Sequence, residues 1–215
     1  MEAVAYEDRY REGSARIDDA PDDDTRQRQL TRLGNVANAA GLTHLFHGER
    51  DVAATWLLRA AERWRESSAD APPGSWGRPI GAIKARVIAG DQKGAADDAR
   101  WCLELGAAGA ESPIGRYAAC LALLVLGRDA AARPLTSSIR ERDDFPPAVA
   151  DALATIAAGD RLGYIEAVEA VLESFETRDE YLEDVPVADT VLVLQVLAES
   201  RGIAAELDSE LLPPK

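Results

Sequence analysis

The sequence predicts an all-α fold of stacked antiparallel helical hairpins, with about ten helices in total. Three observations support this fold class. Pro79, Pro113 and Pro147 stand 34 residues apart, and each is followed by an alanine-rich apolar stretch that ends at a glycine. Aromatic residues make up only 6% of the chain, and no alternating run of β-branched residues indicates a strand. A fixed period of this length is typical of helical repeats.

The residues that punctuate each unit follow from the chemistry of helix ends. Proline at the first helical position loses no hydrogen bond, and Ser112 before Pro113 is a candidate N-cap. A glycine after the last periodic residue can adopt the left-handed conformation that ends a helix, and an aspartate close behind it can cap the next helix. These turns are Gly90-Asp91, Gly127-Arg128-Asp129 and Gly159-Asp160. We expect each turn to join two antiparallel helices.

The N-terminal part is predicted to form charged helices. The first covers residues 2–19 and the second covers residues 22–47, where three aspartates at the start complement the helix dipole. Gly34 and Gly41 mark points at which the second helix can kink. An amphipathic helix over 52–66 follows, with two tryptophans on its apolar face.

The remaining helices follow the 34-residue period. The second helices of the three proline-led units are predicted over 92–105, 129–142 and 161–175. A last unit begins at Pro186, its helix over 187–201 ends at Gly202, and the tail folds back as a cap. We assign a single domain over 1–215, with N-terminal helices over 1–47 and repeat units over about 48–78, 79–112, 113–146, 147–185 and 186–215.

Charge limits the classes of partner. The chain carries 38 acidic and 24 basic residues, which gives a net charge of -14. We expect neither nucleic acid nor a membrane as a partner, because both would be repelled over most of the surface. We expect another protein with a basic surface to be attracted instead, and the alternative is that the acidity reflects adaptation to a salty cytoplasm. The start of the chain lacks the pattern of a signal peptide, and the apolar runs are shorter than the ~20 residues of a membrane span, so we expect a cytoplasmic protein.

Few residues suggest catalysis or metal binding. Cys102 and Cys120 lie in apolar helical stretches, which favours small core residues over a disulfide. His44 and His47 are three residues apart with Glu49 nearby, so one helix face can present two imidazoles to a metal ion. A zinc or iron site needs three or four ligands, with supporting carboxylates at helical spacing, and the sequence has no third histidine. We interpret the pair as helix-end residues and expect no metal and no cofactor.

Two local strings supply most of the candidate binding residues. Trp76 and Arg78 flank a glycine at a helix entrance and can form an aromatic and guanidinium anchor. The alternative is that Trp76 packs over the helix start while Arg78 pairs with a carboxylate. The acidic connection over 175–184 suits a basic partner, and Arg178 and Tyr181 are its candidate contacts. The alternative is solvated charge with Tyr181 and Leu182 packed beneath it.

Asp189 interrupts an otherwise apolar helix. A buried carboxylate is costly unless it is paired, so we expect a cationic partner for it. Arg116 and Arg78 are the candidates, because each lies near the start of a neighbouring first helix and stacked repeats place equivalent positions side by side. Arg116, Tyr117 and Asp189 complete the set of candidate binding residues.

The spacing around the turns resembles the tetratricopeptide repeat, in which small residues allow close helix contact five and twelve positions after the turn glycine. These residues are Ala53 and Ala60 after Gly48, and Ala95 and Cys102 after Gly90. The match weakens after Gly127 and Gly159, where larger side chains occupy the second position. The resemblance implies a right-handed α-α superhelix with a concave groove for peptides or proteins.

A second resemblance covers the end of the chain. The apolar stretch 189–194, the Arg201-Gly202-Ile203 string and residues 208–213 are similar to the ending of helical immunity proteins of bacterial polymorphic-toxin systems. That resemblance implies binding and neutralising one cognate toxin, with no cofactor. No functional residue carries over from it.

Three functions are therefore open. The leading one is a non-catalytic helical-repeat module that binds another protein, with the immunity protein as its specific form. The alternative is a metal-dependent or carboxylate-based enzyme on a helical scaffold, which rests on the histidine pair and the acidic connection. A further alternative is a structural subunit that self-associates as a homodimer through the apolar faces of its end helices.

Overall fold

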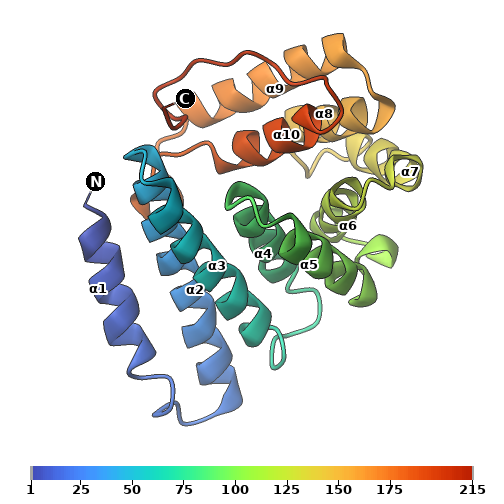
Figure 1. The fold of residues 1–215 in the computed structure, drawn as a ribbon. Helices are drawn as coiled ribbons and strands as arrows, with labels where there is room; N and C mark the ends of the chain where they lie inside the picture. The colour runs from blue at the N-terminus through green and yellow to red at the C-terminus, as the bar shows by residue number, and fades with distance from the viewer. Residues whose placement is uncertain (1, 215) are drawn as a thin grey trace.

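The computed structural model describes residues 2–214, and within this range the chain forms ten α-helices, two short 3₁₀ helices and no strand. The elements are α1 (Ala3–Ser14), α2 (Asp23–Phe46), α3 (Arg50–Ser67), α4 (Gly77–Ile88), α5 (Gln92–Glu104), η1 (Ala107–Gly109), α6 (Pro113–Val125), α7 (Asp129–Arg140), α8 (Pro147–Ala158), α9 (Arg161–Glu176), η2 (Leu182–Asp184) and α10 (Asp189–Glu199). From α1 to α9 each helix packs on the next one in sequence (Figure 1). The all-α fold class is confirmed.

The turns between paired helices have the predicted chemistry. Gly90 and Gly159 have φ of 76° and 71°, the left-handed conformation that a side chain would strain. Asp91 and Asp160 then cap α5 and α9 by accepting hydrogen bonds from backbone amides. The third turn differs, because Arg128 occupies the N-cap position of α7 and the aspartate that follows it makes a long-range ion pair instead.

The proline opens the first helix in two of the three proline-led units. Pro113 and Pro147 open α6 and α8 as predicted, and Ser112 caps α6 by accepting from the amide of Gly115 at 3.1 Å. Helix α4 instead begins at Gly77, two residues before Pro79. A proline is tolerated there because the first-turn amides of a helix have no intrahelical acceptor.

Two glycines one period apart allow neighbouring units to approach closely. A Cβ atom on Gly81 would lie 2.8 Å from the Trp64 ring, and one on Gly115 would lie 2.7 Å from the Trp76 ring nitrogen. Each tryptophan therefore packs against the backbone of a first helix where a side chain would collide with it. This contact explains why glycine follows two residues after both Pro79 and Pro113.

Helix α2 runs from Asp23 to Phe46 without a break in its helical assignment and includes Gly34 and Gly41. A Cβ atom at these positions would come within 2.6 Å of Trp64 and 2.7 Å of Leu57, both on α3. The glycines thus serve close helix packing. Helix α1 is shorter than the predicted 2–19, because it ends at Ser14 and leaves a turn before α2.

The last predicted unit, 186–215, is not a helical hairpin within the residues described. Its helix α10 packs on α4, α8 and α9, so it lies against the inner helices of the array and covers part of the expected concave face (Figure 1). Apolar residues surround α10 on most sides, which suits a buried helix. The tail folds back as predicted, in an extended form, and the carbonyl of Leu211 accepts from the amide of Ala188 at 3.0 Å.

The apolar core of the described residues falls into three clusters. Its largest cluster joins α4 to α10 and includes Cys102 and Cys120, both unpaired. Burial raises the pKa of each thiol to about 12, which matches the prediction that they are core residues. A second cluster brings Val185 and Val187 against α2, α3 and α4. The connection after α9 therefore crosses back to the N-terminal half of the array.

Candidate functional site

Two adjoining pockets of about 610 and 380 Å³ form a groove on the inner side of the array, which we call the inner groove. Five residues line both pockets, so the two are continuous: Asn38, Lys84, Ile114, Leu182 and Asp189. The residues come from α2, α4, α6, η2 and α10. Both volumes lie in the range of about 300–1,000 Å³ that is usual for ligand sites.

Six of the seven candidate binding residues line the inner groove. Trp76 and Arg78 lie in the first pocket, and Tyr117, Arg178 and Tyr181 lie in the second. Asp189 lines both pockets. The seventh, Arg116, lies outside them, where its Nε donates to the carbonyl of Ala110 at 3.0 Å and holds the loop before α6.

Arg78 is held by neutral groups. Its Nε donates to Ser67 Oγ at 3.0 Å, and its Nη2 donates to Gln27 Oε1. The suggested pairing with a carboxylate is wrong, because no carboxylate of residues 2–214 lies within 4.0 Å of this guanidinium. Burial lowers the pKa of Arg78. Its positive charge therefore stays uncompensated beside the first pocket.

Trp76 is half-buried and packs against the core, across Gly115 at the start of α6. Trp76 thus covers the first helix of the following unit, whereas the alternative prediction placed it over the start of its own helix. Trp64 forms another aromatic wall of the first pocket, and its Nε1 donates to Asn35 Oδ1 at 3.1 Å. The first pocket is accordingly bounded by two indoles.

Asp189 is paired, but with neither predicted arginine. Its Oδ2 lies 2.6 Å from Lys84 Nζ on α4, and both side chains are largely buried. The same Nζ donates to Thr190 Oγ1 at 3.0 Å. The prediction of an arginine partner was wrong because α10 does not continue the stack of repeats. This helix crosses the inner face of the array and meets the middle of α4.

Aromatic side chains dominate the second pocket. The rings of Tyr117 and Phe145 lie 5.5 Å apart between centroids, and burial together with the charge of Asp189 raises the pKa of Tyr117. Arg178 lies over the Phe175 ring at 3.7 Å from its centroid, and Tyr181 donates its hydroxyl to the Phe175 carbonyl at 2.6 Å. The acidic connection therefore presents its aromatic residues to the groove.

Strained backbone forms part of the rim. Glu183 and Asp184 have φ of 53° and 59°, an unusual conformation for residues other than glycine. Helix α1 holds this turn, because Tyr6 donates to the Glu183 carbonyl at 2.7 Å and Arg9 lies 2.7 Å from the Glu183 carboxylate. Leu182, just before the strained pair, is 60% exposed.

Sequence reasoning missed three polar residues of the groove. Asn35 and Asn38 lie on α2, and Lys84 faces them from α4 across the first pocket. The sequence did indicate the two asparagines, because asparagine has a low helix propensity and these two lie three residues apart in the apolar middle of a helix. Lys84 is also one of only three lysines in the chain, at 84, 93 and 215.

The two histidines do not form a shared site. His44 is buried with its Nε2 at 2.7 Å from Glu7 Oε1 and its Nδ1 hydrogen-bonded to Glu49, whereas His47 is exposed. Burial alone would lower the pKa of His44, but the hydrogen bonds and charges of Glu49 and Glu7 outweigh it and raise that pKa. One ring nitrogen thus joins α2 to α1, and the other joins it to Glu49 at the N-cap position of α3.

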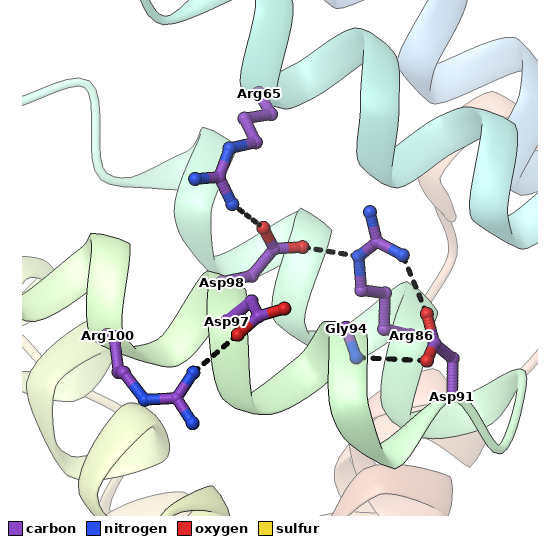
Figure 2. Close-up of polar contacts among 7 residues, drawn as sticks. All are labelled: Arg65, Arg86, Asp91, Gly94, Asp97, Asp98 and Arg100. Atoms are coloured by element: carbon purple, nitrogen blue, oxygen red, sulfur yellow. Dashed lines mark hydrogen bonds and ion pairs between the residues drawn. The ribbon is translucent and has the colours of Figure 1, made fainter.

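A separate ionic cluster lies on the outer side of α4 and α5 (Figure 2). Asp98 is fully buried, with its Oδ2 2.6 Å from Arg86 Nε and its Oδ1 hydrogen-bonded to Arg65. Arg86 also lies 2.7 Å from Asp91, the cap of α5. Each carboxylate is matched by a guanidinium, so this cluster joins three helices and offers no free group for chemistry.

Comparisons with family models, curated proteins and solved structures yield no match. Across residues 2–214, no group of three or more histidine, cysteine, aspartate or glutamate side chains is placed to hold a metal ion. In the same range, no helix has both the length and the apolar character that crossing a bilayer requires.

Proposed function

We propose that the chain is a non-catalytic helical-repeat module, similar to tetratricopeptide repeats, that binds another protein through the inner groove. This proposal rests on one observation: six candidate binding residues, which lie far apart in the sequence, line the same groove. The groove is lined by residues from three separate segments of the chain: Trp76 with Arg78, the 175–184 connection, and Asp189. Tryptophan, tyrosine and arginine are the residues most enriched at binding hot spots.

Exposed apolar side chains at the junction of the two pockets support the same function. Leu182 and Ile114 are 60% and 43% exposed and lie in both pockets. Apolar surface next to half-buried indoles favours contact with a protein segment, because burying such area stabilises a complex by about 25 cal/mol per Å² before the costs of association.

The proposal is tested by calorimetry with the product of the neighbouring gene. Leu182→Ser is expected to weaken the complex at least about tenfold with unchanged folding, because its side chain is largely exposed. Leu162→Ser is the matched control: Leu162 is 75% exposed on α9, outside the groove, and its loss should leave affinity unchanged. Equal effects of the two variants would place binding elsewhere on the surface.

The narrower form of the proposal makes the partner a toxin with a basic surface. The net charge of -14 favours it, because opposite net charges accelerate association. Co-expression with the neighbouring toxin should then protect the host cell, and the association rate should fall steeply with added salt. A rate that does not depend on salt contradicts a basic partner.

A further inference from the structure

The α2 side of the inner groove is polar where a helix packed in an array is normally apolar. Thr31, Asn35 and Asn38 recur at helical spacing and line the first pocket. Asn38 is only 8% exposed, and no side-chain hydrogen bond to it is found within the described chain. Its amide is not among the enclosed polar atoms that lack a partner, so it opens on the pocket and is available to a ligand.

The cations around this stripe are not equivalent. Lys84 is neutralised by Asp189 at 2.6 Å. Among residues 2–214, the only side-chain acceptors of Arg78 are Ser67 and Gln27, and both are uncharged. The first pocket therefore carries one surplus positive charge inside a chain whose net charge is -14.

The walls on either side of these donors are apolar. Trp64, Trp76 and Ile80 line the first pocket, and Ile114 and Leu182 continue into the second. A ligand that fits both pockets has a single anionic group between apolar groups. A phosphate, with its charge of about -1.5 to -2, is normally met by several arginines, whereas one surplus guanidinium and two amides match a carboxylate.

We infer that the first pocket binds the side-chain carboxylate of an aspartate or glutamate in an extended segment of the partner protein, flanked by apolar side chains that occupy the groove walls. This inference rests on the proposed protein-binding function and specifies its ligand. Arg78 contributes the charge, and Asn38 and Asn35 contribute amide donors. The acidic exterior attracts a basic partner at long range, while the groove selects an acidic residue at short range.

Random dodecapeptides displayed on phage, fused so that their C-terminus is not free, test the inference on the full chain. We expect enriched peptides to share one acidic position with apolar residues on both sides. Synthetic versions with glutamine in place of that glutamate should bind about tenfold to hundredfold more weakly, the usual effect of losing hydrogen bonds to a charged group.

Asn38→Leu is the decisive variant, because its amide makes no hydrogen bond within residues 2–214 and leucine has the same branched arrangement of heavy atoms. It should unfold at the same or a higher temperature and bind the selected glutamate peptide at least about tenfold more weakly. Gln29→Leu is the matched control on the same helix: Gln29 Oε1 has no hydrogen-bond partner among the described residues, and it lies in a different pocket. Its affinity should equal that of the unchanged protein.

The outcomes separate the two claims. Selected peptides without an acidic position, or peptides that bind the Asn38→Leu variant unchanged, overturn the carboxylate pocket and leave protein binding by the groove intact. No enrichment at all, together with no effect of Leu182→Ser on the natural complex, overturns both.

Discussion

Asp98 offers the sharpest test of how this array is stabilised. The perturbation is Asp98→Asn, which keeps the size of the side chain and removes its charge. Loss of one partner from a buried ion pair usually costs about 3–5 kcal/mol. Two features reduce that figure here: the Arg65 side chain is 45% exposed and can regain water, and Arg86 keeps Asp91 at 2.7 Å. We expect the free energy of unfolding to fall by about 2–3 kcal/mol.

The neighbouring residue provides the control. Asp97 pairs with Arg100, and both side chains are 53% exposed (Figure 2). Asp97→Asn should therefore change stability by less than about 0.5 kcal/mol. Urea unfolding followed by far-ultraviolet circular dichroism measures both variants. The reasoning is refuted if Asp98→Asn unfolds like the unchanged protein, or if Asp97→Asn loses a comparable free energy.

Three further predictions address other contacts. His44→Gln should lose stability mainly at acidic pH, because the pKa of His44 in the folded protein is raised above 6.5. The free energy that His44 contributes to folding is therefore present below pH 6.5 and is lost as the pH rises through the folded pKa. Urea unfolding from about pH 6 to 9 measures this change. Gly115→Ala should destabilise the fold by about 1–3 kcal/mol and lower the melting temperature by several degrees, because the added Cβ would lie 2.3 Å from another methyl group. Gly77→Ala is the control and should leave the melting temperature unchanged, because the space around Gly77 is open. Arg201→Ala should cost about 1–3 kcal/mol in urea unfolding, because it removes a hydrogen bond to the Leu124 carbonyl and an ion pair at 2.5 Å.

The parts of the fold that local chemistry specifies were predictable. Helices α5, α7 and α9 lie within two residues of their predicted bounds. A turn glycine precedes the start of each, and aspartate N-caps define the starts of α5 and α9 without reference to the rest of the chain. Pro113 and Ser112 placed the start of α6 in the same way. Local signals of this kind depend only on backbone conformation and capping.

Contacts made between distant segments were not predictable. The period places Asp189 beside the first helices of earlier units, but α10 is apolar on most sides and gains more by crossing the inner face than by extending the stack. That crossing brings Lys84 to Asp189 and leaves Arg78 without a carboxylate. Asn38 was missed for the same reason, because only the folded arrangement shows that its amide has no partner.

The returning segment changes how the array resists unfolding. In an open solenoid each repeat contacts only its neighbours, so stability is close to a sum of local terms. Here Val185 and Val187 pack against α2 to α4, while Arg201 pairs with Asp129 at the start of α7. One segment thereby links the first half of the array to the second, and neither half can open without breaking these contacts.

The same segment gives the groove its shape before any partner arrives. A positive φ at a residue other than glycine costs about 1–3 kcal/mol, and Glu183 and Asp184 both adopt one. Tyr6 and Arg9 of α1 offset that strain by holding Glu183. Because Leu182 immediately precedes the strained pair, their conformation fixes how its exposed side chain stands at the junction of the two pockets. Helix α1, which touches neither pocket, therefore positions a groove residue through the backbone of η2.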